Sequence, residues 1–279
     1  MRIATYNVEW FDALFDDADR VLADGKWSAR YNVTRQQQVE ALAVVFTAMD
    51  ADAVMVIEAP DTNRQRSTVR ALESFAAAFD LRARKAVMGF SNETQQEIAL
   101  LYDPDILEAR HDPCGPAPVP GAPHDDGAPR FDGTFRIDLD IDATEDKVVF
   151  SKPPLEIALT VRATGQSLRV IGAHLKSKAP HGAANRDEVM RLSIANRRKQ
   201  LAQAIWLRAR VEEHLSAGDS LIVMGDLNDG PGLDEYENLF GRSSVEIVMG
   251  HGENALFDPH ASEALSSRIG PQLSTARFY

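Results

Sequence analysis

Polar residues of catalytic type stand directly after a short apolar run near the carboxyl end of the sequence. Residues 221–224 read Leu-Ile-Val-Met, and Gly225, Asp226 and Asn228 follow them. In an extended backbone, residues two apart project to the same face, so we expect the carboxylate and the carboxamide to lie side by side. Such a pair is suited to holding a metal-bound water and a phosphate oxygen. The alternative is an ordinary polar turn after a core strand, because Asn, Asp and Gly dominate turns.

Three other apolar runs end in the same way. The first run of the chain ends at Asn7, residues 54–57 are followed by Glu58, and residues 168–173 are followed by His174. Each residue has an ordinary interpretation as a turn cap, a helix start or a hydrogen-bonded histidine at a sheet edge. Ligand sites in α/β folds gather beyond the ends of strands. Four such ends therefore favour one shared site.

The residue types at these positions agree on one chemistry. Glu58 and Asn7 offer hard oxygen ligands, which favour Mg²⁺, Mn²⁺ or Ca²⁺. His174 can donate to a phosphoryl oxygen, and Lys176 adds a positive charge for substrate binding. These groups suit the hydrolysis of a phosphoester. The sequence has no closely spaced His or Cys set, which predicts no structural zinc site, and Cys114 has no base nearby in sequence to make it a nucleophile.

The elements that must position these residues follow from hydrophobic periodicity. Apolar runs predict strands at residues 2–8, 53–57, 98–102, 155–161, 168–173 and 221–224. Helical spacing predicts helices at 34–49, 67–79 and 187–215, with Thr34 as an N-cap and with Leu201, Ile205, Arg208 and Val211 on one face of the last. The basic cluster 197–199 is expected on a solvated face, with approach to an anionic substrate as the alternative. Alternating strands and helices predict a layered α/β fold.

Composition limits the class of protein. The 279 residues carry a net charge of −12, which suits metal binding and argues mildly against a tight duplex nucleic-acid binder. A single cysteine fits a reducing compartment. No apolar run approaches the roughly 18 residues of a membrane span, and no signal region precedes the first strand pattern, so we expect a cytoplasmic protein. Residues 111–133 hold six prolines and four glycines, which predicts a surface loop inserted into one domain.

Taken in order, several segments of the chain resemble the endonuclease/exonuclease/phosphatase superfamily, whose members share a deoxyribonuclease I-like fold. The matching segments are Ala4-Thr-Tyr-Asn-Val8, Val56-Ile-Glu58, Ile98-Ala-Leu-Leu-Tyr-Asp-Pro104, Phe150-Ser-Lys-Pro-Pro154, Gly172-Ala-His-Leu175 and Gly225-Asp-Leu-Asn228. The resemblance implies a four-layered α/β sandwich, in which helices flank two packed mixed sheets. It also implies that residues 1–279 form a single domain of this type.

The resemblance implies a role for each strand-end residue. Glu58 is the expected principal metal ligand, and Asn7 is expected to help position both metal and phosphate. His174 is expected to hydrogen-bond the scissile phosphate, and Asn228 to orient it. Asp226 is expected to position the attacking water or to hold a second metal.

The chain departs from the family pattern at two places. Lys152 stands where the family often has arginine, and these two cations are not interchangeable. Family members end with an Asp-His pair on a final strand, and nothing after Asp229 matches it, so we expect a chain truncated at its carboxyl end. Gln96 or Glu97 is a candidate to orient His174.

Together these observations predict a divalent-metal-dependent phosphoesterase, most simply a nuclease that hydrolyses phosphodiester bonds with metal-activated water. A phosphatase or phosphodiesterase acting on a lipid, inositol or nucleotide phosphate is the first alternative. A non-catalytic binding protein that kept the fold is the second. The expected partner is a phosphoester substrate, with nucleic acid as one candidate, and the sequence does not indicate an oligomeric state.

Overall fold

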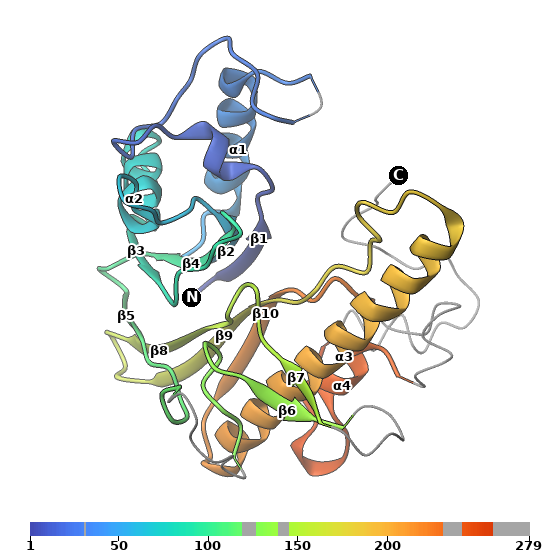
Figure 1. Cartoon of the computed structure of the whole chain (residues 1–279). Coiled ribbons are helices and arrows are strands. Elements are labelled where there is room, and N and C mark those ends of the chain that lie inside the picture. Colours follow the sequence, from blue (N-terminus) through green and yellow to red (C-terminus); the bar gives the residue numbers. More distant parts are fainter. Residues whose placement is uncertain (31, 119–126, 139–144, 231–241, 259–279) are drawn as a thin grey trace, which may run out of the picture.

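Two four-stranded sheets form the centre of the molecule, which we describe from a computed structural model (Figure 1). The structure describes residues 1–30, 32–118, 127–138, 145–230 and 242–258. The first sheet has the order β1-β2-β4-β3, with β1 and β2 parallel and the other neighbours antiparallel. Its strands are β1 (Ile3–Asn7), β2 (Ala53–Ala59), β3 (Lys85–Met88) and β4 (Glu97–Tyr102).

The second sheet has the order β10-β9-β8-β5, with β10 and β9 parallel and the other neighbours antiparallel. Its strands are β5 (Leu107–His111), β8 (Leu155–Val161), β9 (Ser167–His174) and β10 (Leu221–Asp226). A separate antiparallel pair consists of β6 (Phe135–Ile137) and β7 (Asp146–Val148). Each large sheet therefore contributes one parallel pair, whose carboxyl ends carry the polar residues named above.

Helices cover the outer face of each sheet (Figure 1). The first sheet carries α1 (Arg35–Met49) and α2 (Thr68–Ala78), and the second carries α3 (Arg186–Ser216) and the short α4 (Ser244–Met249). Two 3₁₀ turns, η1 (Phe11–Leu14) and η3 (Gly252–Asn254), complete the described elements. Among the described helices, none is both long enough and apolar enough to span a membrane.

Three apolar clusters separate these layers. Phe46 and Phe75 belong to a cluster between α1, α2 and the first sheet, whereas Met55 belongs to a second cluster between the two sheets. A third cluster, around Trp206, lies between α3 and the second sheet. Along β2, Val54 joins the first cluster and its neighbour Met55 the second, as alternating side chains of a strand require. The predicted four-layered α/β sandwich with two packed mixed sheets is confirmed.

The helix boundaries follow the sequence closely. Thr34 caps α1 as predicted: its side chain accepts the Gln37 N–H, and the Gln37 side chain accepts the Thr34 N–H. Of the residues predicted on one face of α3, Val211 is fully buried, whereas Leu201, Ile205 and Arg208 are only half-buried. The buried stripe also runs through Trp206 and Arg210, which the prediction did not include. Arg197 of the basic cluster is also buried, which contradicts the solvated face expected for residues 197–199.

The proline-rich segment 111–133 is not wholly on the surface. Phe131 is fully buried, and its ring packs edge-on against Phe150 and beside Trp206. The segment thus supplies part of the core between α3 and the second sheet, which composition alone does not reveal. Residues 119–126 of this predicted loop lie outside the described residues, as do residues 259–279 at the expected truncation.

Candidate active site

The packing of the two sheets brings the ends of their parallel pairs together. Asn7 ends β1 and Glu58 lies near the end of β2, whereas His174 and Asp226 end β9 and β10 and are paired in register. The two groups meet across the sandwich, where Asn7 Nδ2 donates a hydrogen bond of 3.0 Å to Asp226 Oδ2. Four residues predicted from separate strand ends therefore lie in one place.

Short polar contacts connect these four side chains. Asn7 Nδ2 also lies 3.5 Å from Glu58 Oε1, while Asn7 Oδ1 accepts the backbone N–H of Glu9 at 3.1 Å. His174 Nε2 is 3.8 Å from Glu58 Oε1 and 3.9 Å from Asp226 Oδ2. Both carboxylates thus converge on one imidazole nitrogen and one amide.

Glu58 is held in an unusual backbone conformation. Its φ of 60° is left-handed, and the pairing of β2 with β4 shifts register between Ile57 and Ala59. Such a conformation costs on the order of 1–3 kcal/mol and persists where the surrounding structure enforces it. The bulge aims the carboxylate at the junction of the sheets, where Gln96 Nε2 donates to Glu58 Oε2 at 2.9 Å.

The expectation that Gln96 or Glu97 orients His174 is wrong. Gln96 contacts Glu58, and the Glu97 carboxylate accepts a 2.7 Å hydrogen bond from Asn92 Nδ2. Gln96 therefore lies at the site, but its partner is Glu58 and not His174. The antiparallel register of β4 beside the end of β2 puts it next to Glu58.

The charges around Glu58 fit a hard divalent cation. Burial raises the pKa of Glu58, and although the Lys152 charge lowers it, the neighbouring Glu9 and Asp226 carboxylates raise it further. Two carboxylates that repel each other in a half-buried position are stabilised by a cation between them. Their oxygen ligands are those that Mg²⁺, Mn²⁺ and Ca²⁺ prefer. The donor set at this junction therefore fits the predicted metal.

Lys152, whose role the sequence left open, lies against His174. Its Nζ lies 3.3 Å from His174 Nδ1 and 3.4 Å from Nε2. Burial lowers the pKa of Lys152, whereas the Glu58 and Asp226 charges raise it. Burial, together with the Lys152 charge, lowers the pKa of His174 to about 4, so the imidazole is neutral near pH 7. The lysine thus brings its positive charge directly to the junction.

Asn228 does not continue the extended strand, which corrects the side-by-side arrangement expected for Asp226 and Asn228. Its φ is 52°, and its backbone N–H donates to Asp226 Oδ1 at 2.8 Å. Its side-chain Nδ2 donates to the Leu175 carbonyl at 2.9 Å, just past the end of β9. Asn228 therefore ties the ends of β9 and β10 together and holds the Asp226 carboxylate in place.

Two buried glutamines of α3 support this corner from behind. Gln200 Nε2 donates to the carbonyls of Leu227 and Asn228, and Gln203 Oε1 accepts the backbone N–H of Lys176. The Lys176 charge lies near enough to Lys152 to lower its pKa. The sequence signal for these two residues was the spacing of two glutamines three positions apart, which places both on one face of a helix. The prediction from apolar residues did not include this face.

Gly225 is required for the close approach of β10 to β9. Its φ is 133°, and a Cβ at this position would lie 2.0 Å from the carbonyl oxygen of Ala173. We therefore expect Gly225→Ala to destabilise the fold by about 1–3 kcal/mol or more, as overpacking does, in urea unfolding monitored by fluorescence. Gly230→Ala is the matched control, because a Cβ there meets no atom within 4 Å. Equal stability of the two variants would contradict this account.

Glu97 predicts an unusual dependence of stability on pH. Burial raises its pKa from 4.5 to about 7. Between these values the folded chain binds more protons than the unfolded chain, so the contribution of Glu97 falls as pH rises from about 4.5 to 7. The loss is on the order of 3 kcal/mol. We expect Glu97→Gln to lose this pH-dependent part when urea unfolding is compared at pH 5 and pH 8.

The test for Glu97 compares how steeply the free energy of unfolding changes with pH in the wild type and in Glu97→Gln. The absolute stabilities are not compared, because the substitution also changes the hydrogen bonds of Asn92 at every pH. Glu93→Gln is the control, since Glu93 is exposed on the loop before β4. A wild-type slope that persists in Glu97→Gln would show that another group titrates in this range.

Solved structures with a similar arrangement of elements come from several organisms. The match to the mannosyl-6-phosphatase Bt3783 of Bacteroides thetaiotaomicron covers 86% of this chain and 70% of the phosphatase chain, with 14% sequence identity and a TM-score of 0.43. The D. rerio TDP2 complexed with single-strand DNA product matches 87% and 65%, with 14% identity and a TM-score of 0.41. The human Nocturnin catalytic domain matches 88% and 70%, with 15% identity and a TM-score of 0.41.

Sequence comparison gives the family. Among curated proteins, the uncharacterized C8orf48 homolog of Mus musculus is 28% identical over 89 residues, which are 32% of this chain and only 30% of the length of that protein. The model of the Endonuclease/Exonuclease/phosphatase family matches residues 4–275, nearly the whole chain. The strand-end residues Asn7, Glu58, His174 and Asp226 all lie inside this match, and the chain belongs to the Endonuclease/Exonuclease/phosphatase family.

Proposed function

We propose that this protein is a divalent-metal-dependent phosphoesterase that hydrolyses phosphodiester bonds by the attack of water. The observation that carries the proposal is the meeting of Asn7, Glu58, His174 and Asp226 at the junction of the two sheets, with Lys152 against the imidazole. Carboxylates, a neutral imidazole and a buried cation together supply what phosphoryl transfer needs from a protein.

Glu58 and Asp226 are the proposed metal-holding carboxylates, with Mg²⁺ as the expected ion and Mn²⁺ or Ca²⁺ as alternatives. Asn7 donates to both carboxylates, so it positions them in addition to its predicted role as a ligand. When bound, the cation lowers the pKa of a water molecule and offsets charge on the phosphoryl oxygens. The Asn228 N–H holds the Asp226 carboxylate, and we expect this carboxylate to orient the attacking water.

The remaining residues act on the phosphate. Neutral His174 donates a hydrogen bond to a phosphoryl oxygen, and the Lys152 ammonium beside it stabilises the negative charge that develops there. Lys176 adds positive charge on the side of Lys152 for substrate binding. Asn228 keeps its predicted role in orienting the substrate, together with its structural role between the strand ends.

Net charge bears on the choice between substrate classes. A net charge of −12 disfavours a tight, nonspecific hold on duplex nucleic acid, whose affinity comes from phosphate contacts with cationic side chains. We therefore propose a nuclease acting on single-stranded nucleic acid, with a lipid, inositol or nucleotide phosphate as the alternative substrate. We also propose a cytoplasmic location, which a single cysteine suits. We further propose that residues 1–279 form one domain, into which segment 111–133 is inserted.

The test is turnover by the full chain. Supercoiled plasmid, a single-stranded oligonucleotide, a chromogenic phosphodiester and a chromogenic phosphomonoester are each incubated with Mg²⁺, Mn²⁺ or Ca²⁺, or with a chelator. We expect cleavage of the oligonucleotide with Mg²⁺ and its loss with the chelator. Cleavage of the monoester alone would support the phosphatase alternative. Binding of the oligonucleotide without turnover under any metal would leave the non-catalytic binding protein as the better account.

A further inference from the structure

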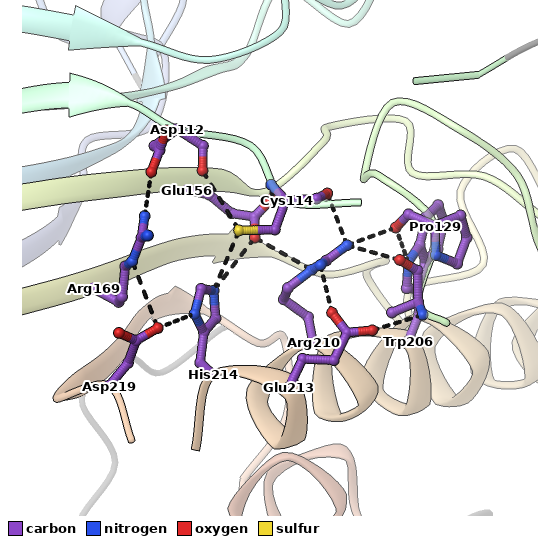
Figure 2. A network of polar contacts seen from close by, with 11 residues as sticks. Asp112, Cys114, Pro129, Glu156, Arg169, Trp206, Arg210, Glu213, His214 and Asp219 are labelled. Atoms are coloured by element: carbon purple, nitrogen blue, oxygen red, sulfur yellow. Dashed lines mark hydrogen bonds and ion pairs between the residues drawn. The ribbon is translucent and has the colours of Figure 1, made fainter. Parts of the chain in front are cut away.

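A second cluster of ligand-type side chains lies between α3 and the second sheet, and we call Cys114, Glu156 and His214 the Cys-Glu-His cluster (Figure 2). Cys114 follows β5, Glu156 lies in β8, and His214 lies in the last turn of α3. Cys114 Sγ is 3.9 Å from His214 Nε2, and Nε2 is 3.7 Å from Glu156 Oε1. One donor atom from each residue lies within 4.8 Å of the other two.

The cluster lies on the opposite face of the second sheet from the candidate active site. Glu156 pairs in register with Ile171, which packs in the same apolar cluster as Trp206 of α3. The next residue, Gly172, faces Met55 between the two sheets, and His174, two residues further along β9, shares that face. The Cys-Glu-His cluster is therefore a separate feature and not part of the proposed phosphoesterase site.

Glu156 directs toward the cluster an oxygen that forms ion pairs but no well-aligned hydrogen bond. Its side chain is 3% exposed, and Oε2 accepts the backbone N–H of Cys114 at 3.1 Å. Oε1 has no hydrogen-bond partner in the described part of the chain. Arg210 Nε is 3.3 Å away, but it too makes no hydrogen bond. The charge of Arg210 offsets this buried carboxylate, but Oε1 lacks a well-aligned hydrogen bond, so a cation bound at the cluster would supply a direct contact to it.

His214 is oriented as a metal-ligating histidine. Its Nδ1 lies 2.8 Å from Asp219 Oδ2, and Asp219 is in turn 3.6 Å from Arg169 Nε (Figure 2). A carboxylate that accepts Nδ1–H fixes the tautomer and leaves the lone pair of Nε2 directed away from it. Here Nε2 faces the thiol and the Glu156 carboxylate. Glu156, together with Asp219, raises the pKa of His214, so an ion bound at Nε2 would displace the proton that these carboxylates favour.

We propose that the Cys-Glu-His cluster binds a Zn²⁺ ion through Cys114 Sγ, His214 Nε2 and Glu156 Oε1, with a water as the fourth ligand. A mixed sulfur, nitrogen and oxygen set suits this borderline-soft ion, whereas the oxygen set of the active site suits Mg²⁺. Ligand distances of about 2.0–2.3 Å require Sγ and Nε2, and Nε2 and Oε1, to approach each other by a few tenths of an ångström. Sγ and Oε1, which lie within 4.8 Å of each other, also have to come closer, by rotation of the two side chains. The thiol releases its proton to solvent when the ion binds.

The nearby Arg210 has an acidic partner and hydrogen-bond acceptors other than Glu156. Arg210 also pairs with Glu213, and its guanidinium donates to the carbonyls of Cys114 and Ala128 (Figure 2). The proposed ion would join the carboxyl-terminal turn of α3 to β8 and to the segment after β5. It would thereby brace the layer that carries Gln200 and Gln203 behind the candidate active site.

The thiol itself provides the first test, because Cys114 is the single cysteine of the chain. The full-length protein is stripped with a chelator, and its reaction with Ellman's reagent is followed with and without one equivalent of Zn²⁺. We expect Zn²⁺ to slow the reaction at least tenfold, Mg²⁺ to leave it unchanged, and added chelator to restore it. An unchanged rate with Zn²⁺ would overturn the proposal, and this measurement needs no variant.

Cobalt substitution identifies the ligands. One equivalent of Co²⁺ should give a thiolate-to-cobalt charge-transfer band and the visible bands of a tetrahedral site. Cys114→Ser should lose the charge-transfer band, and His214→Gln should weaken Co²⁺ binding at least tenfold. His181→Gln, which changes an exposed histidine before α3, and Glu58→Gln should retain both spectra. Equal spectra in the wild type and Cys114→Ser would overturn the proposal, whatever the outcome of the phosphoesterase assays.

Discussion

Glu58→Gln is expected to lower kcat/KM for phosphodiester hydrolysis by about a thousandfold or more. Glutamine keeps the size of the side chain but removes the charge that the proposed divalent cation needs at the junction of the sheets. Metal-based stabilisation of a phosphoryl transition state is worth several kcal/mol, and each 1.4 kcal/mol or so is tenfold in rate. The measurement is steady-state turnover of the best substrate over a range of Mg²⁺ concentrations.

Two comparisons make the Glu58 result specific. Glu93→Gln removes an exposed carboxylate and should leave turnover within about twofold of the wild type. Urea unfolding should show that Glu58→Gln folds. Burial raises the pKa of Glu58, which means that it disfavours the charged side chain, so a neutral glutamine should not destabilise the fold. If folded Glu58→Gln retained activity within tenfold of the wild type, the metal-ligand assignment would fail.

His174→Ala is expected to lower kcat by about 10²–10³, with a much smaller change in KM. The loss of one preorganised donor to a developing oxyanion typically has this size. His174 is buried and its pKa is lowered to about 4, so its proposed contribution is a hydrogen bond to a phosphoryl oxygen and not a full positive charge. His174→Gln, which keeps an N–H donor on a side chain of similar length, should recover part of the lost rate.

A purely structural role for His174 predicts a different pattern. In that case both variants would lose stability in urea while keeping kcat per folded molecule. The matched control is His181→Gln, because His181 is exposed and lies outside the junction of the sheets. Unchanged kcat in folded His174→Ala would remove His174 from the proposed mechanism.

The sequence alone determined the strands whose side chains are buried on both faces. β2 and β8 are almost continuously apolar, and their predicted bounds agree closely with the structure. β5 was missed because the exposed residues Glu108 and Arg110 interrupt its apolar pattern. β3 was missed because it is only four residues long and begins with the exposed Lys85. The active-site candidates at strand ends were also predictable, since polar residues after a buried strand must leave the sheet at its edge.

Apolar periodicity does not mark the buried face of α3, for a physical reason. Its buried face carries Gln200, Gln203, Arg210 and His214, each of which has polar partners supplied by other elements. A periodicity of apolar residues cannot find such a face, because hydrogen-bonded polar side chains are buried there. The true face becomes visible only once the carbonyls and carboxylates opposite the helix are in place.

The sequence by itself determined the identity of the strand-end residues, because secondary structure depends on side chains close together in the chain. Tertiary structure decided which of them meet and how. Asn7 and Asp226 are separated by 219 positions, and Cys114 and His214 by 100, so no local pattern encodes either contact. The packing of two sheets and a helix creates both, because burying their apolar faces brings the polar groups at their edges within hydrogen-bond and ion-pair distance.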